Sequence, residues 1–328
     1  MDCRRNCPHF TGDGILTSLT VLSLFDGISC GQIALARAGI TVKQYFASEI
    51  DKHAIKVTQS RHPDTIQLGD ILELDVSKLP EIDLLIGGSP CQSFSVAGDG
   101  TGFDGKSKLF WEFVRILKEL KPKYFLLENV KMKSSWRDII TETVGVEPIE
   151  INSALVSGQH RRRYYWTNIP GITQPKDQDI SLSDVLEVIS DDEDVTYGDR
   201  LAPNGKTVRV EATDFPYTFY EARTDEGKAE RRRLRKLLGR DTTPRGAKYK
   251  IYLPLRTRKS NCIVATPSQL DWVVDNEGRY RKLTVTELER LQTLPVGYTE
   301  GISPTQRRKA IGNGWTVDVI AHIFLGIK

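Results

Sequence analysis

The first half of the sequence alternates short apolar runs with segments of helical periodicity, and this alternation limits the fold more than any other feature. Apolar runs occupy residues 21–25, 45–49, 82–86 and 124–128, and apolar residues recur at helical spacing between them, most clearly over 109–120. Strands separated by helices form a mostly parallel sheet. The pattern predicts a doubly wound α/β domain, in which ligands bind at the carboxyl ends of the strands.

The alternating pattern ends near residue 170, where the composition changes. Residues 171–280 are rich in charged residues, Pro and Gly and contain only short strand-like pieces, whereas helical periodicity returns within 281–328. We therefore expect an α/β domain over 20–170 that residues 281–328 rejoin, with a smaller irregular domain inserted over 171–280. Residues 1–19 are expected to form a disordered leader.

Composition and cysteine content narrow the class of protein. Charged residues make up 27% of the 328 positions and hydrophobic residues 39%, as in folded soluble proteins. No apolar run approaches the roughly 20 residues that span a bilayer, and no secretory signal is present, so we expect a cytoplasmic protein without membrane contact. The five cysteines, an odd and sparse set, do not indicate a disulfide framework. Cys3, Cys7 and His9 lack a fourth nearby ligand, so no metal site is predicted.

Positive charge is concentrated in the expected inserted domain. Residues 228–259 hold thirteen Lys or Arg against two Asp or Glu. The members that we select as nucleic-acid contacts are Arg231, Arg232, Arg233, Arg235, Lys236, Arg256 and Arg258. A basic block of this density favours binding to phosphate backbones, although a solvated helix face would have the same composition.

A turn of small residues lies between the first strand and the first helix. It consists of Phe25, Asp26, Gly27, Ile28, Ser29 and Cys30. Small residues let a backbone approach a ligand closely, but the turn lacks the full GxGxxG spacing of a dinucleotide site. Glu49, at the end of the second strand, is placed to accept hydrogen bonds from ribose hydroxyls, or is an ordinary exposed carboxylate. Asp70 could accept from an adenine amino group or cap a local turn.

A cysteine and a carboxylate follow two strands of the predicted sheet. Cys91 comes just after the strand at 82–86, and the flanking Pro90, Gln92 and Ser93 make burial in a core less favourable. Glu128 ends the strand at 124–128. Because parallel strands end at the same edge of a sheet, this carboxyl group could act as an acid on whatever the cysteine attacks.

Three polar residues alternate beyond the fourth strand. Gln159, Arg161 and Arg163 share one face if this segment enters a strand. Two arginines aimed at the same pocket suit an anionic or carbonyl-bearing substrate. A salt-bridged surface strand is the alternative interpretation.

The order of these motifs resembles that of the DNA cytosine-5 methyltransferases. The matching segments are Phe25-Asp26-Gly27, Glu49, Gly69-Asp70, Gly88-Ser89-Pro90-Cys91-Gln92-Ser93, Glu128-Asn129-Val130, Gln159-x-Arg161-x-Arg163, Arg281-Lys282-Leu283-Thr284, Arg290-Leu291-Gln292 and Gly312-Asn313. The resemblance covers about six-tenths of the chain. Gly314-Trp315-Thr316-Val317 is most similar to the animal de novo enzymes, whereas the compact chain is more similar to bacterial or phage modification enzymes. Much of the family has Ser where this chain has Gly314.

The resemblance implies a Rossmann-like methyltransferase domain and a covalent mechanism. Cys91 would attack carbon 6 of a cytosine that has been flipped out of double-stranded DNA. Glu128, as an acid, would bind N3 of the cytosine. Arg163 would hold O2, and Arg161 would support the site.

The resemblance also implies S-adenosylmethionine as cofactor, bound by the turn at 25–30. Glu49 would hold its ribose, and Asp70 and Ile71 would lie near its adenine. Asn313, Gly314 and Trp315 would close over its methionine end. DNA contacts are expected from Gln92, Ser93 and Gln159, together with the basic block in residues 171–280, where the family has its target-recognition region. A restriction endonuclease is a candidate partner, and the oligomeric state stays open.

Two other functions remain as alternatives. One branch of the family methylates cytosine in tRNA, but the Cys-Phe-Thr tripeptide of that branch is missing from this sequence. A catalytically inactive, DNA-binding regulatory homologue is the other alternative. Against it, Cys91, Glu128, Glu49 and Asn313 are all present.

Overall fold

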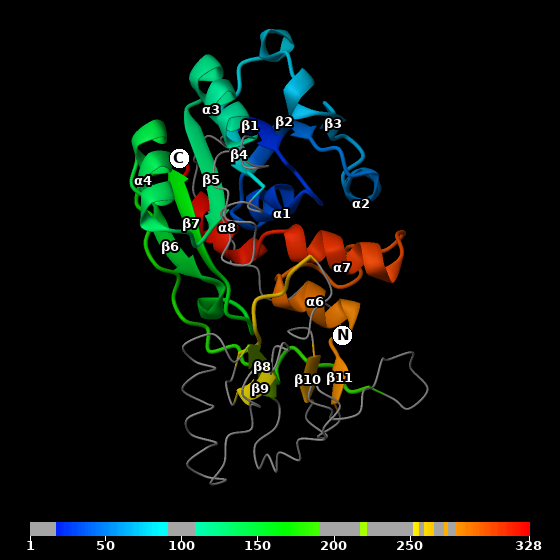
Figure 1. The fold of residues 1–328 in the computed structure, drawn as a ribbon. Coiled ribbons are helices and arrows are strands. Elements are labelled where there is room, and N and C mark those ends of the chain that lie inside the picture. The colour runs from blue at the N-terminus through cyan, green and yellow to red at the C-terminus, as the bar shows by residue number, and fades with distance from the viewer. Residues whose placement is uncertain are drawn as a thin grey trace, which may run out of the picture.

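The computed structural model describes residues 18–90, 109–189, 217–221, 252–255, 259–265, 272–274 and 280–328. An α/β unit with a seven-stranded sheet lies next to a smaller four-stranded sheet (Figure 1). The large sheet has the order β3-β2-β1-β4-β5-β7-β6. Its strands are β1 (Ser18–Leu24), β2 (Thr41–Ser48), β3 (Ile66–Gln67), β4 (Leu84–Gly88), β5 (Tyr124–Val130), β6 (Ile149–Asn152) and β7 (Arg162–Thr167).

The pairing of the large sheet confirms the predicted doubly wound α/β fold. Strands β1 to β5 pair in parallel, whereas β7 runs antiparallel to both β5 and β6. The strand order reverses between β1 and β4, which is where open sheets of this kind bind their ligands. The reversed direction of β7 brings the start of this strand, rather than its end, to the ligand-binding edge.

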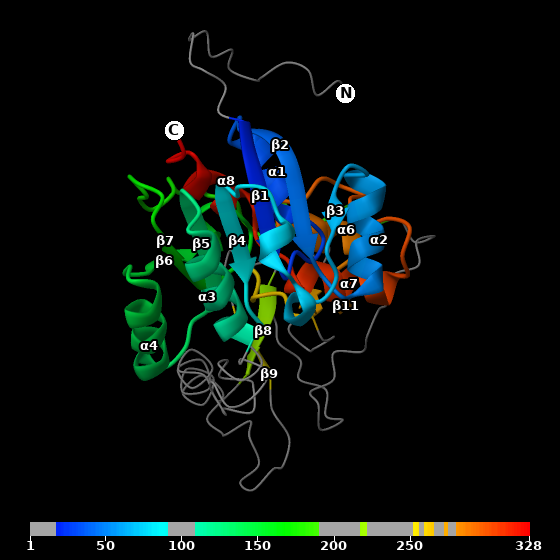
Figure 2. The same ribbon diagram turned by 90° about the horizontal axis from the view of Figure 1, so that it is seen from above.

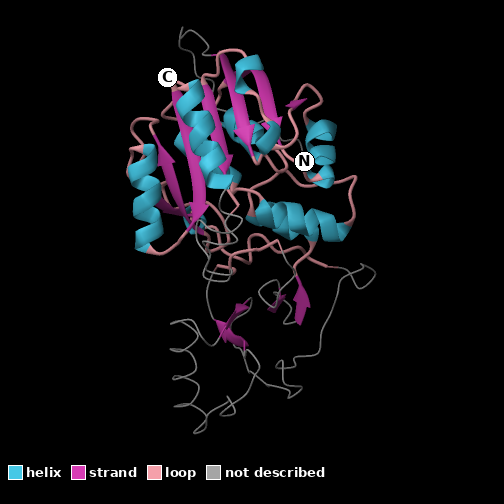
Figure 3. Cartoon of the chain, turned by 45° about the horizontal axis from the view of Figure 1, so that its top comes forward, coloured by secondary structure: helices cyan, strands magenta, loops and turns pink. Residues whose placement is uncertain are grey.

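Helices cover both faces of the large sheet (Figure 3). They are α1 (Cys30–Arg37), α2 (Lys52–Arg61), α3 (Leu109–Leu120), α4 (Ser134–Val144), α6 (Val285–Leu291), α7 (Pro304–Asn313) and α8 (Val317–Phe324), with short 3-10 turns η1 (Ile71–Glu73), η2 (Val76–Lys78) and η5 (Ser153–Leu155). None of the helices in the described ranges is long and apolar enough to cross a membrane.

Alternate residues of β1 enter two different cores. Val21 packs with α1, α2 and α8 on one face, and Leu22 packs with α3 and α4 on the other. Both side chains are fully buried. The C-terminal helix α8 lies beside α1 (Figure 2), so the end of the chain returns to the first core as the sequence predicts.

The second sheet is antiparallel, with the order β11-β10-β8-β9. Its strands are β8 (Tyr217–Glu221), β9 (Tyr252–Leu255), β10 (Trp272–Val274) and β11 (Tyr280–Lys282). These strands fall largely within 171–280, for which the sequence predicts an inserted domain. The boundaries of that domain stay a prediction. Of the leader expected at 1–19, residues 1–17 lie outside the described residues, whereas Ser18 and Leu19 begin β1. The selected basic residues from Arg231 to Arg258 also lie outside the described residues.

A buried ion pair joins the second sheet to α6. Arg281 of β11 donates to both carboxylate oxygens of Glu287, at 2.9 and 2.8 Å, and both side chains are fully buried. Glu287 also accepts from the backbone N–H of Thr284, whose hydroxyl caps α6 in return. The carboxylate of Glu287 therefore takes part in the N-terminal cap of α6 and also holds β11 against this helix.

Candidate active site

A cavity of about 340 Å³ opens at the carboxyl ends of β1, β2, β4 and β5. Residues far apart in the sequence line it, and thirteen of them are site residues that the sequence analysis selected. These are Phe25, Asp26, Gly27, Cys30, Glu49, Asp70, Ile71, Glu128, Arg161, Arg163, Asn313, Gly314 and Trp315. Of the remaining selected residues that are described, Ile28, Ser29 and Gln159 are fully buried and do not line the cavity.

The turn at 25–30 is held in its shape by backbone conformation and by a buried carboxyl group. Phe25 and Ser29 both have φ of 56°, and Gly27 has φ of 60°. Asp26 accepts a hydrogen bond from the hydroxyl of Tyr45 at 2.8 Å and another from the hydroxyl of Ser29. Burial raises the pKa of Asp26 to about 6, although these hydrogen bonds act in the opposite direction. The first strand thus ends in a rigid turn whose backbone faces the cavity.

Glu49, directly after β2, is not an ordinary exposed carboxylate. Its Oε2 accepts from the backbone N–H of Gly27 at 2.8 Å, and its Oε1 accepts from the N–H groups of Ile50 and Asp51 at 2.8 Å each. These bonds tie the end of β2 to the turn after β1. The carboxylate therefore lies fixed at the cavity wall, and its remaining lone pairs can accept from a ligand.

Asp70 caps a local turn, as one of its two interpretations expects, and its contact with an adenine stays a prediction. Its carboxylate caps η1 by accepting from the N–H of Leu72 at 3.0 Å, and it also lines the cavity. The next residue, Ile71, is buried and presents an apolar surface at the same wall. Gly69, just before them, has φ of 76°, which permits the tight bend into η1.

Glu128 and Arg163 form an ion pair at the opposite wall. The Nε of Arg163 lies 2.9 Å from Oε1 of Glu128, and both side chains are largely buried, with 14% and 12% exposed. The indole N–H of Trp315 donates to the other oxygen, Oε2, at 3.2 Å. Both oxygens of this carboxyl group thus accept from donors that come from different elements of the fold.

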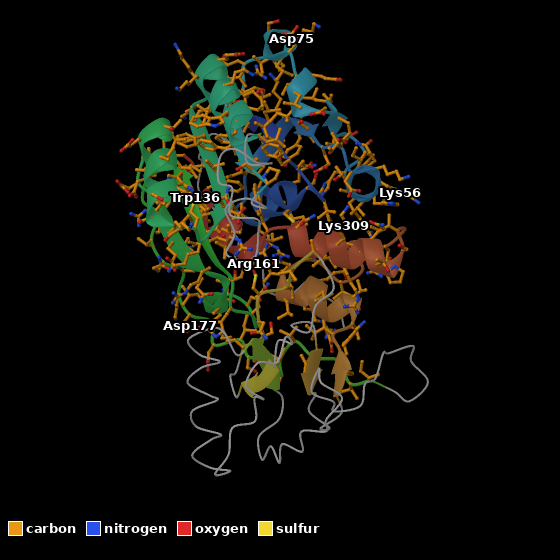
Figure 4. The ribbon with its side chains drawn as sticks, in the orientation of Figure 1. Lys56, Asp75, Trp136, Arg161, Asp177 and Lys309 are labelled. Atoms are coloured by element: carbon orange, nitrogen blue, oxygen red, sulfur yellow. The ribbon has the colours of Figure 1, made fainter. Side chains whose placement is uncertain are left out.

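Arg161, labelled in Figure 4, lines the cavity and holds the backbone beside it. This buried guanidinium donates to the carbonyl oxygens of Gly314 at 2.9 Å, Gly312 at 3.3 Å and Ile263 at 3.0 Å. Its hydrogen bonds join three segments of the chain, including the loop between α7 and α8. The geometry fits the supporting role that the sequence predicts.

Gln159 lies away from the cavity that the two arginines reach. It precedes β7, and its side chain is fully buried. The amide donates to the carbonyl oxygen of Leu291 at 2.6 Å and to Oε1 of Gln292 at 3.0 Å. These bonds hold the loop before β7 against the end of α6, and the DNA contact expected of Gln159 stays a prediction.

Two contacts made by residues that line the cavity were not found from the sequence. Cys262 lies with its sulfur 3.5 Å from Nη1 of Arg161 and 3.8 Å from Nη2 of Arg163. Burial acts to raise the pKa of Cys262, but the charges of the two guanidinium groups outweigh it and hold the pKa below its usual range. Lys309 on α7 forms an ion pair with Asp51 at 2.6 Å on the cavity rim (Figure 4). Lys309 precedes Asn313 by one helical turn, which is the signal that could have found it.

The predicted nucleophile lies outside the described residues, as do Gln92 and Ser93. Pro90, the residue before Cys91 in the sequence, lines the cavity, and so does the buried Ser89. The amide of Asn129 donates to the hydroxyl of Ser89 at 3.0 Å, which fixes the ends of β4 and β5 to each other. Within the part of the chain that the structure describes, no cluster of three or more His, Cys, Asp or Glu side chains could hold a metal ion.

Comparisons with known proteins agree with this arrangement. The sequence matches the family of C-5 cytosine-specific DNA methylases over residues 19–141 and 157–328. Type II methyltransferase M.NlaX of Neisseria lactamica is 29% identical over 322 residues, which cover 92% of this chain and 94% of that protein. Orphan methyltransferase M.SPRI of Bacillus phage SPR is 48% identical over 116 residues, which cover 34% of this chain and about a quarter (26%) of that protein.

A solved structure shows the same fold at low sequence identity. The Entamoeba histolytica methyltransferase EhMeth superposes with a TM-score of 0.62 at 15% identity, covering 95% of this chain and 99% of that chain. The family match extends through both parts of the α/β unit, including the C-terminal residues that close the cavity. The chain belongs to the family of C-5 cytosine-specific DNA methylases.

Proposed function

We propose that this protein transfers a methyl group to carbon 5 of a cytosine flipped out of double-stranded DNA, through a covalent bond between Cys91 and carbon 6. The observation that carries the proposal is the ion pair of Glu128 with Arg163, in one cavity with Glu49 and the turn at 25–30. One wall thus suits a cytosine ring, and the other suits a nucleoside cofactor. Family membership and the name of M.NlaX support the reaction class.

S-adenosylmethionine is the methyl donor that the cavity fits. Ribose hydroxyls need acceptors, and the fixed carboxylate of Glu49 provides them. A Cβ atom placed on Gly27 or on Gly69 would meet no atom within 4 Å, so both positions leave open space for a ligand. Asp26 adds an acidic group that suits the positive charges of this cofactor, and Asp70 can accept from its adenine amino group. When bound, it supplies an electrophilic methyl group.

The residues of the chain would activate the cytosine ring. The thiolate of Cys91 forms a bond to carbon 6, and the electron pair of the 5,6 double bond becomes available at carbon 5. Glu128 binds N3 and stabilises the charge that develops there, and Arg163 holds O2. Once carbon 5 carries the methyl group, a base takes its proton, the electron pair of that C–H bond restores the 5,6 double bond, and the thiolate leaves carbon 6.

DNA recognition is assigned to the region at 171–280. Its basic block would neutralise phosphates and place the duplex, while neighbouring side chains read base edges. Gln92, Ser93 and Gln159 would contact DNA near the flipped base. We also propose that the protein acts in the cytoplasm of a bacterial or phage-infected cell, with a restriction endonuclease as a candidate partner.

Bisulfite sequencing of plasmid DNA from cells that express the protein tests the function. The wild-type protein should leave protected cytosines in a repeated short sequence context, and Cys91→Ala should leave none at equal protein level. Methyl transfer to tRNA but not to duplex DNA would overturn the proposed substrate. Undiminished protection by the Cys91→Ala variant would overturn the covalent mechanism.

A further inference from the structure

The indole of Trp315 occupies a slot formed by a glycine at the end of β4. A Cβ atom placed on Gly88 would lie 3.0 Å from the indole nitrogen and 2.8 Å from Oε2 of Glu128. On the other side, a Cβ on Gly31 would lie 3.8 Å from the ring. The half-buried indole can reach Glu128 because Gly88 carries no side chain in this space.

The backbone on each side of Trp315 is held by hydrogen bonds. The carbonyl oxygen of Gly314 accepts from Arg161 at 2.9 Å and from Gln292 at 3.0 Å. The hydroxyl of Thr316 donates to Oε1 of Gln292 at 2.8 Å and accepts from Ser153 at 2.8 Å. Because both neighbours are fixed, the direction of the indole N–H is set by the fold rather than by a freely rotating loop.

The two oxygens of Glu128 have donors from different parts of the cavity. Arg163, on β7, holds Oε1, whereas Trp315, next to Asn313 and Gly314 in the wall assigned to the cofactor, holds Oε2. Two donors on two oxygens fix the plane of a carboxyl group as well as its position. A displacement of the segment at 312–315 would therefore be passed directly to Glu128.

We infer that Trp315 is a positioning residue for Glu128, and that it couples the cofactor wall of the cavity to the acid at the base-binding wall. This inference rests on the proposed function. The sequence predicts for Trp315 only a contact with the cofactor, and the role in positioning Glu128 is additional. The indole N–H orients the carboxyl group toward the cytosine ring. Loss of the N–H changes the chemistry on the base more than it changes the affinity for the cofactor.

Trp315→Phe in the full-length protein is the first test, because Phe keeps an aromatic ring and removes the N–H. The kcat for methylation of duplex DNA should fall about tenfold, since misplaced catalytic groups lose rate steeply. The dissociation constant for S-adenosylhomocysteine, measured by calorimetry, should stay within about threefold.

Trp166→Phe is the matched control. The indole of Trp166 is fully buried and donates to the hydroxyl of Thr141 at 3.0 Å, but it does not line the cavity. This variant also loses one indole hydrogen bond, and its kcat should remain that of the wild type. Trp315→Phe with wild-type kcat, or with a loss of affinity for S-adenosylhomocysteine that matches its loss of kcat, would overturn the inference. A wild-type protein that methylates no DNA would instead overturn the proposed function.

A measurement without turnover covers the case in which Trp315→Phe does not fold. Each indole N–H gives its own signal in a nitrogen-15 spectrum, and the signal of Trp315 is the one missing from Trp315→Phe or Trp315→His. Glu128→Gln should move this signal more than that of Trp166, and S-adenosylhomocysteine should move it in the wild-type protein. An unchanged Trp315 signal in Glu128→Gln would refute the inference, whether or not the enzyme is active.

Discussion

The Nε of Arg163 lies 2.9 Å from Oε1 of Glu128, although the two residues are not directly paired across their strands. In the antiparallel ladder of β5 and β7, Glu128 is opposite Tyr165, and Arg163 is opposite Val130. The ion pair is therefore diagonal. It forms at the ligand-binding edge because β7 begins where β5 ends.

Arg163→Lys should lower kcat for DNA methylation about 100-fold, because a lysine cannot reproduce the planar guanidinium that holds the carboxylate. Methyl transfer from labelled S-adenosylmethionine to duplex DNA measures the effect. Arg162→Lys is the control, since its side chain is 60% exposed and faces Glu150 at 3.6 Å. An Arg163→Lys variant as active as Arg162→Lys would contradict the proposed role of the pair.

Arg161→Met should destabilise the fold by about 3 kcal/mol, because it leaves buried carbonyl groups without their donor. Ile263 and Gly312 would lose their hydrogen bonds from the guanidinium, at 3.0 and 3.3 Å. Urea denaturation followed by circular dichroism gives the free energy of unfolding. Arg162→Met, at an exposed position of the same segment, should change it little. Equal stability of the two variants would show that Arg161 does not hold these segments together.

Gly314→Ser should be tolerated, at a cost of about 1 kcal/mol in unfolding free energy. A Cβ at this position would lie 3.2 Å from the sulfur of Cys30 and 3.3 Å from the carbonyl oxygen of Ile311, which is tight but not prohibitive. The cost should shrink when Cys30→Ala is also present, because the sulfur is the nearest atom. A double-mutant cycle measures this coupling, and strict additivity would show that Cys30 does not limit the site.

Asp26→Asn should change the pH dependence of stability. The folded-state pKa of Asp26 is raised from 3.8 to about 6, so the folded protein binds this proton more tightly than the unfolded chain. The stability of the wild-type protein should therefore fall, relative to Asp26→Asn, as the pH rises from about 4 to about 6, and stay constant above that window. Urea denaturation at a series of pH values checks the sign. Equal pH dependence of the unfolding free energy in the wild-type protein and in Asp26→Asn would contradict this prediction.

The sequence predicts the elements of this fold well where periodicity decides them. The helix expected at 109–120 is α3 (Leu109–Leu120), and the strand expected at 124–128 is β5 (Tyr124–Val130). Glu49 and Glu128, which the sequence predicts at the ends of strands, lie at the same edge of the sheet, and the cavity brings them together with Asp70.

The orientation of single side chains could not be predicted in the same way. Alternation suggests one shared face for Gln159, Arg161 and Arg163, but β7 begins only at Arg162, so the turn before it sends Gln159 into the core instead. Cys262 reaches the two arginines through a long-range contact that leaves no local pattern in the sequence. Such contacts depend on tertiary packing rather than on periodicity.

The closure of the cavity by Gly312, Asn313, Gly314 and Trp315 has a consequence for biosynthesis. The turn at 25–30 leaves the ribosome almost 290 residues before its partner Trp315. A nascent chain that has not yet reached Trp315 has an open, unfinished pocket. Ligand capture, and with it any stabilisation by the ligand, therefore begins only after this later segment has been made.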